Sequence, residues 1–170
     1  MKTYNLKTRF GAIIDVHFLH KIYKLFDMNS PKSNEDHTLR GKTVVITGGS
    51  SGVGRATVEA FALEGCNIVI AARGEDALDD TVRICEELGV KAIAVPTDVS
   101  VGNEMENLVE KAVAEFGRID IFINNAGVMA SGKFDEIPLE LHEQVIKTNL
   151  FGYMHGAYSV LPLFKRQNEG

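Results

Sequence analysis

The stretch TVVITGGSSGVG, at residues 43–54, carries the clearest indication of the fold class. Its first five residues, Thr43–Thr47, form a short apolar run rich in β-branched side chains, which predicts a buried strand. A glycine-rich turn follows, and the pattern beyond it predicts a helix from about Val53 to Glu64 that ends at Gly65. This order of strand, turn and helix predicts the first part of a βαβ unit.

The same order continues along the chain. Further strands are predicted at residues 67–71, 92–95 and 119–124, and further helices at about 75–88 and 101–116, which end at Gly89 and Gly117. Short β-branched strands that alternate with one-sided helices predict parallel strands with right-handed crossovers. The sequence therefore predicts an α/β fold, a doubly wound parallel sheet. Residues 138–168 are predicted as one long helix or two abutting ones. The residues expected on one apolar face there are Leu141, Val145, Ile146, Leu150, Met154 and Ala157.

Residues 1–38 are predicted to be an N-terminal extension, and residues 39–170 the α/β domain. Apolar residues recur every fourth position from Phe10 to Phe26, which predicts an amphipathic helix, and a polar linker follows from Met28 to His37. Its basic residues suit docking to a membrane surface or a partner. The alternatives are a segment packed on its own domain, or sequence upstream of a true start at Met28. The stretch fits neither a secretory signal nor a transmembrane helix.

Composition excludes some classes of function. The chain has 170 residues and a net charge of −5, with +2 in residues 1–38 and −7 in the remainder. An acidic body argues against nucleic acid as a partner, since phosphate backbones need a basic footprint. Cys66 and Cys85 are interpreted as reduced core thiols of a cytoplasmic protein, and no residue pattern indicates a metal site.

The glycine-rich turn suits a pyrophosphate. Backbone N–H groups and the dipole at a helix N-terminus favour negative charge, and glycines let the phosphate approach the backbone. Such glycines can also mark only a tight turn, but their place between a strand and a helix favours cofactor binding. The residues predicted to bind there are Gly48, Ser50, Ser51, Gly52, Val53 and Gly54.

The spacing Thr-Gly-x-x-x-Gly-x-Gly, at residues 47–54, resembles that of the short-chain dehydrogenase/reductase family. Three segments match that family in the same order: Asp98-Val99, Asn124-Asn125-Ala126-Gly127, and Asn149. The resemblance covers about residues 39–170. It implies a Rossmann-type sheet in the order third, second, first and fourth strand, truncated after the fourth strand and the following helix. It also implies an oxidoreductase that transfers hydride between a nicotinamide cofactor and a carbonyl or alcohol of a small-molecule substrate, within a homo-oligomer.

The resemblance implies roles for the residues after the third strand. The Asp98 carboxylate would accept a hydrogen bond from the adenine amino group, and Val99 would lie beside the ring. The alternative is that Asp98 shapes a turn before a helix that Ser100 caps.

Roles are also implied after the fourth strand and within the long helix. Asn125, Ala126 and Gly127 would line the cofactor ribose and brace the sheet; otherwise they are an ordinary loop. Asn149 would be a catalytic residue that holds a water of the proton relay. Alternatively, Asn149 faces solvent or caps a break between two helices.

The choice of cofactor depends on the end of the second strand. An NAD site places an acidic residue there to hold the ribose 2′-OH. Here the sequence reads Ala71-Ala72-Arg73, and an arginine suits a 2′-phosphate, so NADP(H) is predicted over NAD. The alternative is that Arg73 pairs on the surface with Glu75 or Asp76.

The family's proton-transfer pair is absent. Its chemistry needs Tyr-x-x-x-Lys, in which the lysine lowers the tyrosine pKa. The residues four positions after the tyrosines are Thr8, Asp27, Ala157 and Pro162. The family's serine would lie after Gly170, so this chain alone is expected to be inactive. The competing hypothesis is a non-catalytic dinucleotide-binding or interaction module.

Overall fold

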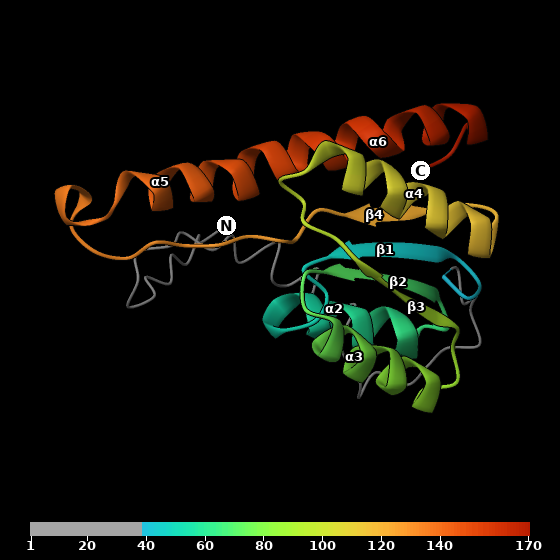
Figure 1. Ribbon diagram of the computed structural model, residues 1–170. Helices are drawn as coiled ribbons and strands as arrows, with labels where there is room; N and C mark the ends of the chain where they lie inside the picture. Colours follow the sequence, from blue (N-terminus) through green and yellow to red (C-terminus); the bar gives the residue numbers. More distant parts are fainter. Residues whose placement is uncertain (1–38) are drawn as a thin grey trace, which may run out of the picture. The chain divides into compact units, whose positions relative to one another are not determined.

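A computed structural model describes residues 39–170 as a four-stranded parallel sheet with helices on both faces (Figure 1). The sheet has the order β3-β2-β1-β4. Its strands are β1 (Thr43–Thr47), β2 (Asn67–Ala72), β3 (Ala92–Pro96) and β4 (Ile121–Ile123). The predicted fold class and strand order are therefore confirmed. The amphipathic helix and linker predicted for residues 1–38 lie outside the described residues.

Helices connect the strands as predicted. They are α2 (Gly52–Leu63), α3 (Glu75–Glu87) and α4 (Gly102–Phe116), followed by the 3-10 turn η1 (Phe134–Glu136), α5 (Leu139–Ile146), the π-helical segment η2 (Lys147–Phe151) and α6 (Gly152–Gln167). Gly65, Gly89 and Gly117 follow the first three helices with φ between 77 and 82°. None of the helices described is long and apolar enough to cross a membrane.

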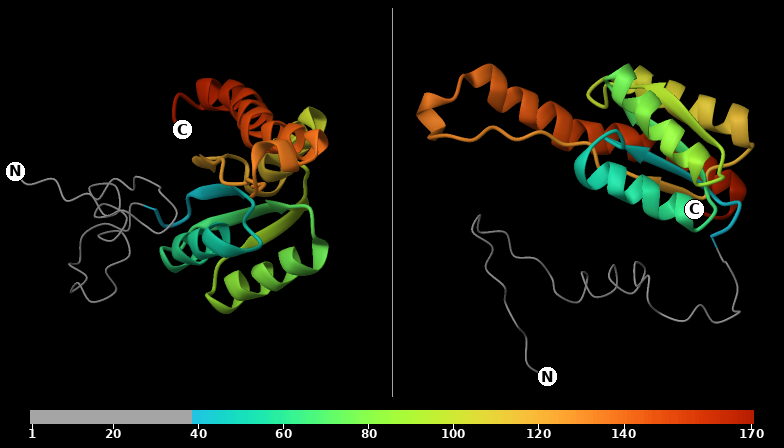
Figure 2. Two further views of the ribbon diagram at one scale, coloured as in Figure 1. Left: turned by 90° about the vertical axis from the view of Figure 1, so that its left-hand side faces the viewer. Right: turned by 90° about the horizontal axis from the view of Figure 1, so that it is seen from below.

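Two hydrophobic layers hold the sheet. One layer joins Val44 and Ile46 of β1 to helices α2 and α3, and the other joins Val45 to α4 and α6 (Figures 1 and 2). Alternate residues of β1 enter opposite layers because side chains alternate along a strand. Each fully buried aliphatic side chain contributes about 1.5–3 kcal/mol to folding. Cys66 and Cys85 lie in the first layer as free thiols, and burial, helped by nearby carboxylates, raises the pKa of each to about 11.

The strand predicted at residues 119–124 is wrong at its ends. Regular pairing covers only Ile121–Ile123, and Ile119 packs in the α4/α6 layer, whereas Ile121 and Ile123 pack in the α2/α3 layer. The chain just before β4 is held by a side chain of α6. Gln167 donates to the Ile119 carbonyl at 2.7 Å and accepts from its N–H at 3.3 Å. The alternation expected for an uninterrupted strand therefore fails at Ile119.

Asp120 fixes the entry of β4 against β1. Its carboxylate accepts hydrogen bonds from the Thr43 amide at 2.8 Å and from Lys42 at 2.9 Å, and lies 2.7 Å from Arg118. Burial alone would raise the pKa of Asp120, but these hydrogen bonds and the Arg118 charge lower it below its ordinary value. The side chain is only 5% exposed, so the ionised carboxylate is held by groups that compensate for lost water.

Helix α6 packs through its small residues. Its buried residues are Gly152, Gly156, Val160 and Leu163, which lie three or four positions apart. Three of the residues predicted on one apolar face, Leu150, Met154 and Ala157, are exposed and do not belong to this buried set. In Figure 2 the segment through α5 extends beyond the sheet.

We expect Asp120→Ala to lower the free energy of unfolding at pH 7 by about 2 kcal/mol, since it removes a buried hydrogen-bonded charge. The folded-state pKa is depressed, so this stabilisation is present above the unfolded pKa of about 4 and is lost as pH falls through the folded pKa. Urea unfolding should show the gap between wild type and variant closing in acid. The matched control is Asp79→Ala, an exposed change on α3. A gap that is constant with pH would contradict the role of the charge.

We also expect the 170-residue chain to self-associate, because β4 lies at an edge of the sheet and apolar residues such as Leu150 and Met154 are exposed. Light scattering on freshly purified protein should show species larger than a monomer at tens of micromolar. A monodisperse monomer would refute this expectation.

Candidate functional site

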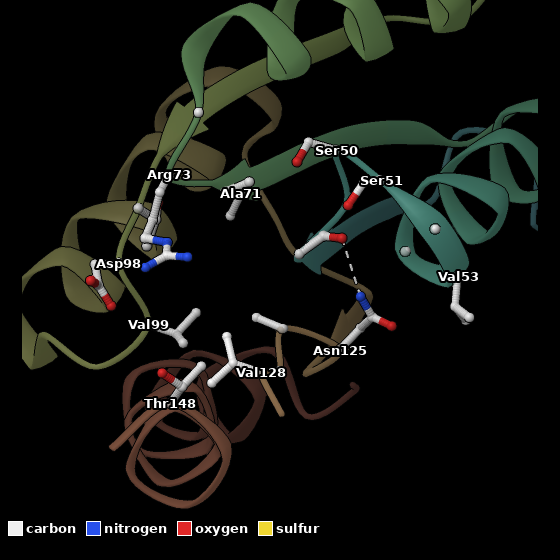
Figure 3. A pocket seen from close by; sticks show the side chains of 18 residues that line it. Ser50, Ser51, Val53, Ala71, Arg73, Asp98, Val99, Asn125, Val128 and Thr148 are labelled. Carbon is white, nitrogen blue, oxygen red and sulfur yellow. Dashed lines mark hydrogen bonds between the residues drawn. The ribbon is translucent and has the colours of Figure 1, made fainter. Parts of the chain in front are cut away.

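A cavity of about 550 Å³ opens at the carboxyl edge of the sheet (Figure 3). The carboxyl ends of parallel strands meet at one edge, so the residues that follow them are brought together. The cavity includes all twelve residues predicted to bind cofactor. These are Gly48, Ser50, Ser51, Gly52, Val53, Gly54, Arg73, Asp98, Val99, Asn125, Ala126 and Gly127.

The glycine-rich turn packs closely at the N-terminus of α2, with no space for side chains at Gly48 and Gly54. A Cβ at Gly48, where φ is +66°, would lie 2.8 Å from the Ala126 Cα, and a Cβ at Gly54 would overlap the Gly48 carbonyl oxygen. The helix begins at Gly52, and Ser51 makes no side-chain capping hydrogen bond. The first N–H groups of α2 are thus left without the partner that a cap would supply, which suits an anion.

Asn125 joins the end of β1 to the loop after β4. Its side-chain amide donates to the carbonyl oxygens of Thr47 at 2.9 Å and Gly48 at 3.3 Å. The Thr47 hydroxyl accepts from the backbone N–H groups of Asn125 at 3.0 Å and Ala126 at 3.1 Å, and donates to the Ile123 carbonyl at 3.3 Å. These bonds join the ends of β1 and β4 at the edge of the sheet where the cavity opens.

Asp98 shapes the turn after β3 and also lines the cavity. Its Oδ1 accepts from the Ser100 amide at 2.9 Å and hydroxyl at 2.7 Å. Burial alone would raise the pKa of Asp98, but these bonds and the nearby Arg73 charge lower it below the ordinary range. The suggestion that Ser100 caps the helix is wrong: Val101 is the N-cap residue of α4, because the Ser100 hydroxyl is turned back to Asp98.

Arg73 directly follows β2 and points into the cavity on the side where Asp98 lies (Figure 3). Arg73 is exposed, as the surface alternative expected, but within residues 39–170 no ion pair joins it to Glu75 or Asp76. Its charge acts instead on Asp98. The guanidinium is therefore placed to meet an anionic group inside the cavity.

Asn149 lies outside this cavity, in the π-helical segment between α5 and α6. Its side chain pairs with one residue of the loop after β4: Nδ2 donates to the Val128 carbonyl at 2.8 Å, and Oδ1 accepts from the Val128 N–H at 2.9 Å. It also lines a second cavity of about 520 Å³, whose other residues are mainly apolar. The two cavities share Val128, so Asn149 fixes a wall common to both.

Several lining residues were missed from the sequence. They are Ala71, Ala72, Gly74, Thr97, Val128 and Thr148. Most of them adjoin predicted residues, and their position next to those motifs was the available signal. Thr148 is different, because it comes from the long helix and is only 7% exposed. Among residues 39–170, no three His, Cys, Asp or Glu residues cluster to hold a metal.

A family model and curated relatives point to the same protein family. Residues 42–170 match the model of the short chain dehydrogenase family. An uncharacterized oxidoreductase of Staphylococcus haemolyticus is 37% identical over 132 residues, which cover 78% of this chain and 56% of that protein. The 3beta-hydroxysteroid dehydrogenase 1 of Eggerthella lenta is 39% identical over 127 residues, or 74% of this chain and 49% of its own length.

A solved structure gives the same result. The short chain dehydrogenase/reductase from Burkholderia phymatum, in complex with NAD, has a TM-score of 0.75 and 38% identity, and the match covers 78% of this chain and 47% of that one. The chain spans about half the length of the curated relatives it matches.

We expect Asn149→Ala to loosen the loop after β4, since the change removes both hydrogen bonds to Val128. Hydrogen exchange of the Val128 amide should become about tenfold faster, as a loss of about 1.4 kcal/mol of local stability would give. The control is Glu143→Ala, an exposed change on α5. Unchanged exchange at Val128 would show that the loop is held by other contacts.

Proposed function

Because the chain belongs to the short chain dehydrogenase family, we propose that it is the cofactor-binding part of an NADP(H)-dependent oxidoreductase. The proposed reaction is hydride transfer between the nicotinamide cofactor and a carbonyl or alcohol group of a small-molecule substrate. The observation that carries this proposal is the cavity in which all twelve predicted residues meet at the carboxyl ends of the strands.

The cavity suits a dinucleotide at three places. The pyrophosphate would lie at the N-terminus of α2, which has no side-chain cap, and a Cβ at Gly52 there would meet no atom within 4 Å. Asp98 and Val99 would hold the adenine, and Asn125, Ala126 and Gly127 would line the other ribose. The ionised state of Asp98, favoured by Ser100 and Arg73, makes its carboxylate an acceptor for an amino group.

The residues of this chain bind and orient, and the cofactor supplies the hydride when bound. Thr47 and Asn125 hold the cavity floor through their mutual bonds. We propose that Asn149 serves the reaction by holding Val128, since its side-chain amide is already engaged there. No tyrosine of the chain has Lys four residues on, so none of its tyrosines is proposed as the proton donor.

We propose NADP(H) over NAD because Arg73 lines the cavity and forms no ion pair with Glu75 or Asp76. Residues 71 and 72, just before it, are alanines and not acidic residues. An arginine there can bond a 2′-phosphate through paired charge-assisted bonds. The related Burkholderia structure contains NAD, so the two choices must be measured for this chain.

We further propose that the whole protein is a cytoplasmic homo-oligomer. Two free buried thiols support a reducing compartment. The exposed Leu150, Met154 and Tyr158 on the segment from η2 to α6 support association with another copy.

We expect Arg73→Ala to weaken NADPH binding by about 1.5–3 kcal/mol, the size of a hydrogen bond to a charged group, and to leave NADH almost unchanged. Titration of both cofactors against wild type and variant measures this. Arg83→Ala, on the exposed surface of α3, is the control. Equal losses for the two cofactors would show that Arg73 does not bind the phosphate. Absence of binding by wild type would favour an interaction module.

A further inference from the structure

His155 of α6 holds the loop between β3 and α4. Its Nδ1 lies 3.0 Å from the carbonyl oxygen of Val99, and its ring packs where a side chain on Gly102 would begin, 3.7 Å from that Cβ position. The ring is half-buried. Among the described residues of α6, His155 is the one whose side chain hydrogen-bonds to this loop.

Two hydrogen bonds tie the first residues of this loop to neighbouring elements. The Thr97 amide donates to the Ala72 carbonyl at 2.8 Å, which ties the start of the loop to β2. The Asp98 amide donates to the Glu104 carboxylate of α4 at 2.6 Å, and the other bonds of Asp98, to Ser100 and Val101, lie within the loop. None of these bonds reaches the Val99 carbonyl, which His155 binds. The loop bears Thr97, Asp98 and Val99, which all line the cavity, and the last two are the residues proposed to hold the adenine.

Helix α6 holds Val99 at two points. The Val99 side chain is 7% exposed and packs on Gly152, where a Cβ would come within 2.7 Å of its Cγ2. One turn further along the helix, His155 binds the Val99 carbonyl. The contact with Gly152 allows α6 to lie close to Val99. The bond from His155 holds the carbonyl group of Val99 in one orientation.

We propose that His155 is a positioning residue for the adenine half of the cofactor: it fixes Val99, and with it Asp98, without lining the cavity itself. This inference rests on the proposed function. It predicts a selective effect, because the glycine-rich turn and the loop after β4 have no bond to His155 among residues 39–170.

The variants that test this proposal follow from the hydrogen bond between His155 and the Val99 carbonyl. A carbonyl oxygen can only accept, so Nδ1 of His155 must carry the hydrogen. His155→Asn keeps an N–H donor on the atom attached to Cγ, whereas His155→Leu keeps bulk and removes the donor. His155→Phe keeps a ring against Gly102 without a donor, and so provides a second test if leucine fails to pack.

The full 170-residue chain is titrated with 2′,5′-ADP, which carries the adenine half, and with nicotinamide mononucleotide, which lacks it. NMR chemical shifts follow both micromolar and millimolar binding. We expect His155→Leu and His155→Phe to bind 2′,5′-ADP about three- to tenfold more weakly, the size of one lost hydrogen bond. Nicotinamide mononucleotide should bind as to wild type, and His155→Asn should restore 2′,5′-ADP binding to within about twofold. The control is Lys165→Ala, an exposed change on the same helix.

Unchanged 2′,5′-ADP binding by the donor-free variants would overturn the inference, as would equal losses for both nucleotides, which indicate a general loss of structure. Failure of His155→Asn to restore binding would also overturn it. Wild-type chain that binds neither nucleotide would instead refute the proposed function.

Discussion

The hydrogen bonds between Thr47 at the end of β1 and Asn125 after β4 are the contacts through which the walls of the cavity are joined. β1 and β4 are neighbours in the sheet, but pairing ends at Ile46 and Ile123. Beyond that point only side chains can keep the two chain segments together. The carboxamide of Asn125 reaches the Thr47 and Gly48 carbonyls and so holds the glycine-rich turn in place. This turn then presents the N-terminus of α2 to the cavity.

The charges of the cavity are arranged in a consistent way. A helix N-terminus at the glycine-rich turn and the guanidinium of Arg73 both favour an anion, and they line the same space. Asp98, which follows β3, carries a negative charge that Ser100 and Arg73 stabilise. A ligand with separate phosphate groups and one amino group would meet a complementary partner at each place. A nucleotide has these groups, which is why the arrangement supports the proposed cofactor.

The helical segment from η2 to α6 holds two of the loops that line the cavity. Asn149 pairs with Val128 after β4, and His155 bonds Val99 after β3. Both loops follow strands of the sheet, so a displacement of this segment would move two sides of the cavity together. The π-helical segment at Lys147–Phe151 is where Asn149 turns toward the loop. Functional sites often contain such π segments.

The positions of the strands and helices and twelve of the eighteen residues that line the cavity could be predicted from the sequence, because they depend on local features and on short motifs, whereas the strand order was implied by the family resemblance. Glycine positions, β-branched runs and the residues at strand ends are read within a few positions, and parallel strands bring their carboxyl ends to one edge. The path of residues 119–120, the pairing of Asn149 with Val128 and the bond from His155 to Val99 could not be predicted. Those bonds join residues 77, 21 and 56 positions apart, and no periodic pattern records which side chains meet over such separations. Folding placed Gly152 of α6 against Val99 and Gly156 against Phe122 and Asn124, and that close packing brought His155 within hydrogen-bonding distance of Val99.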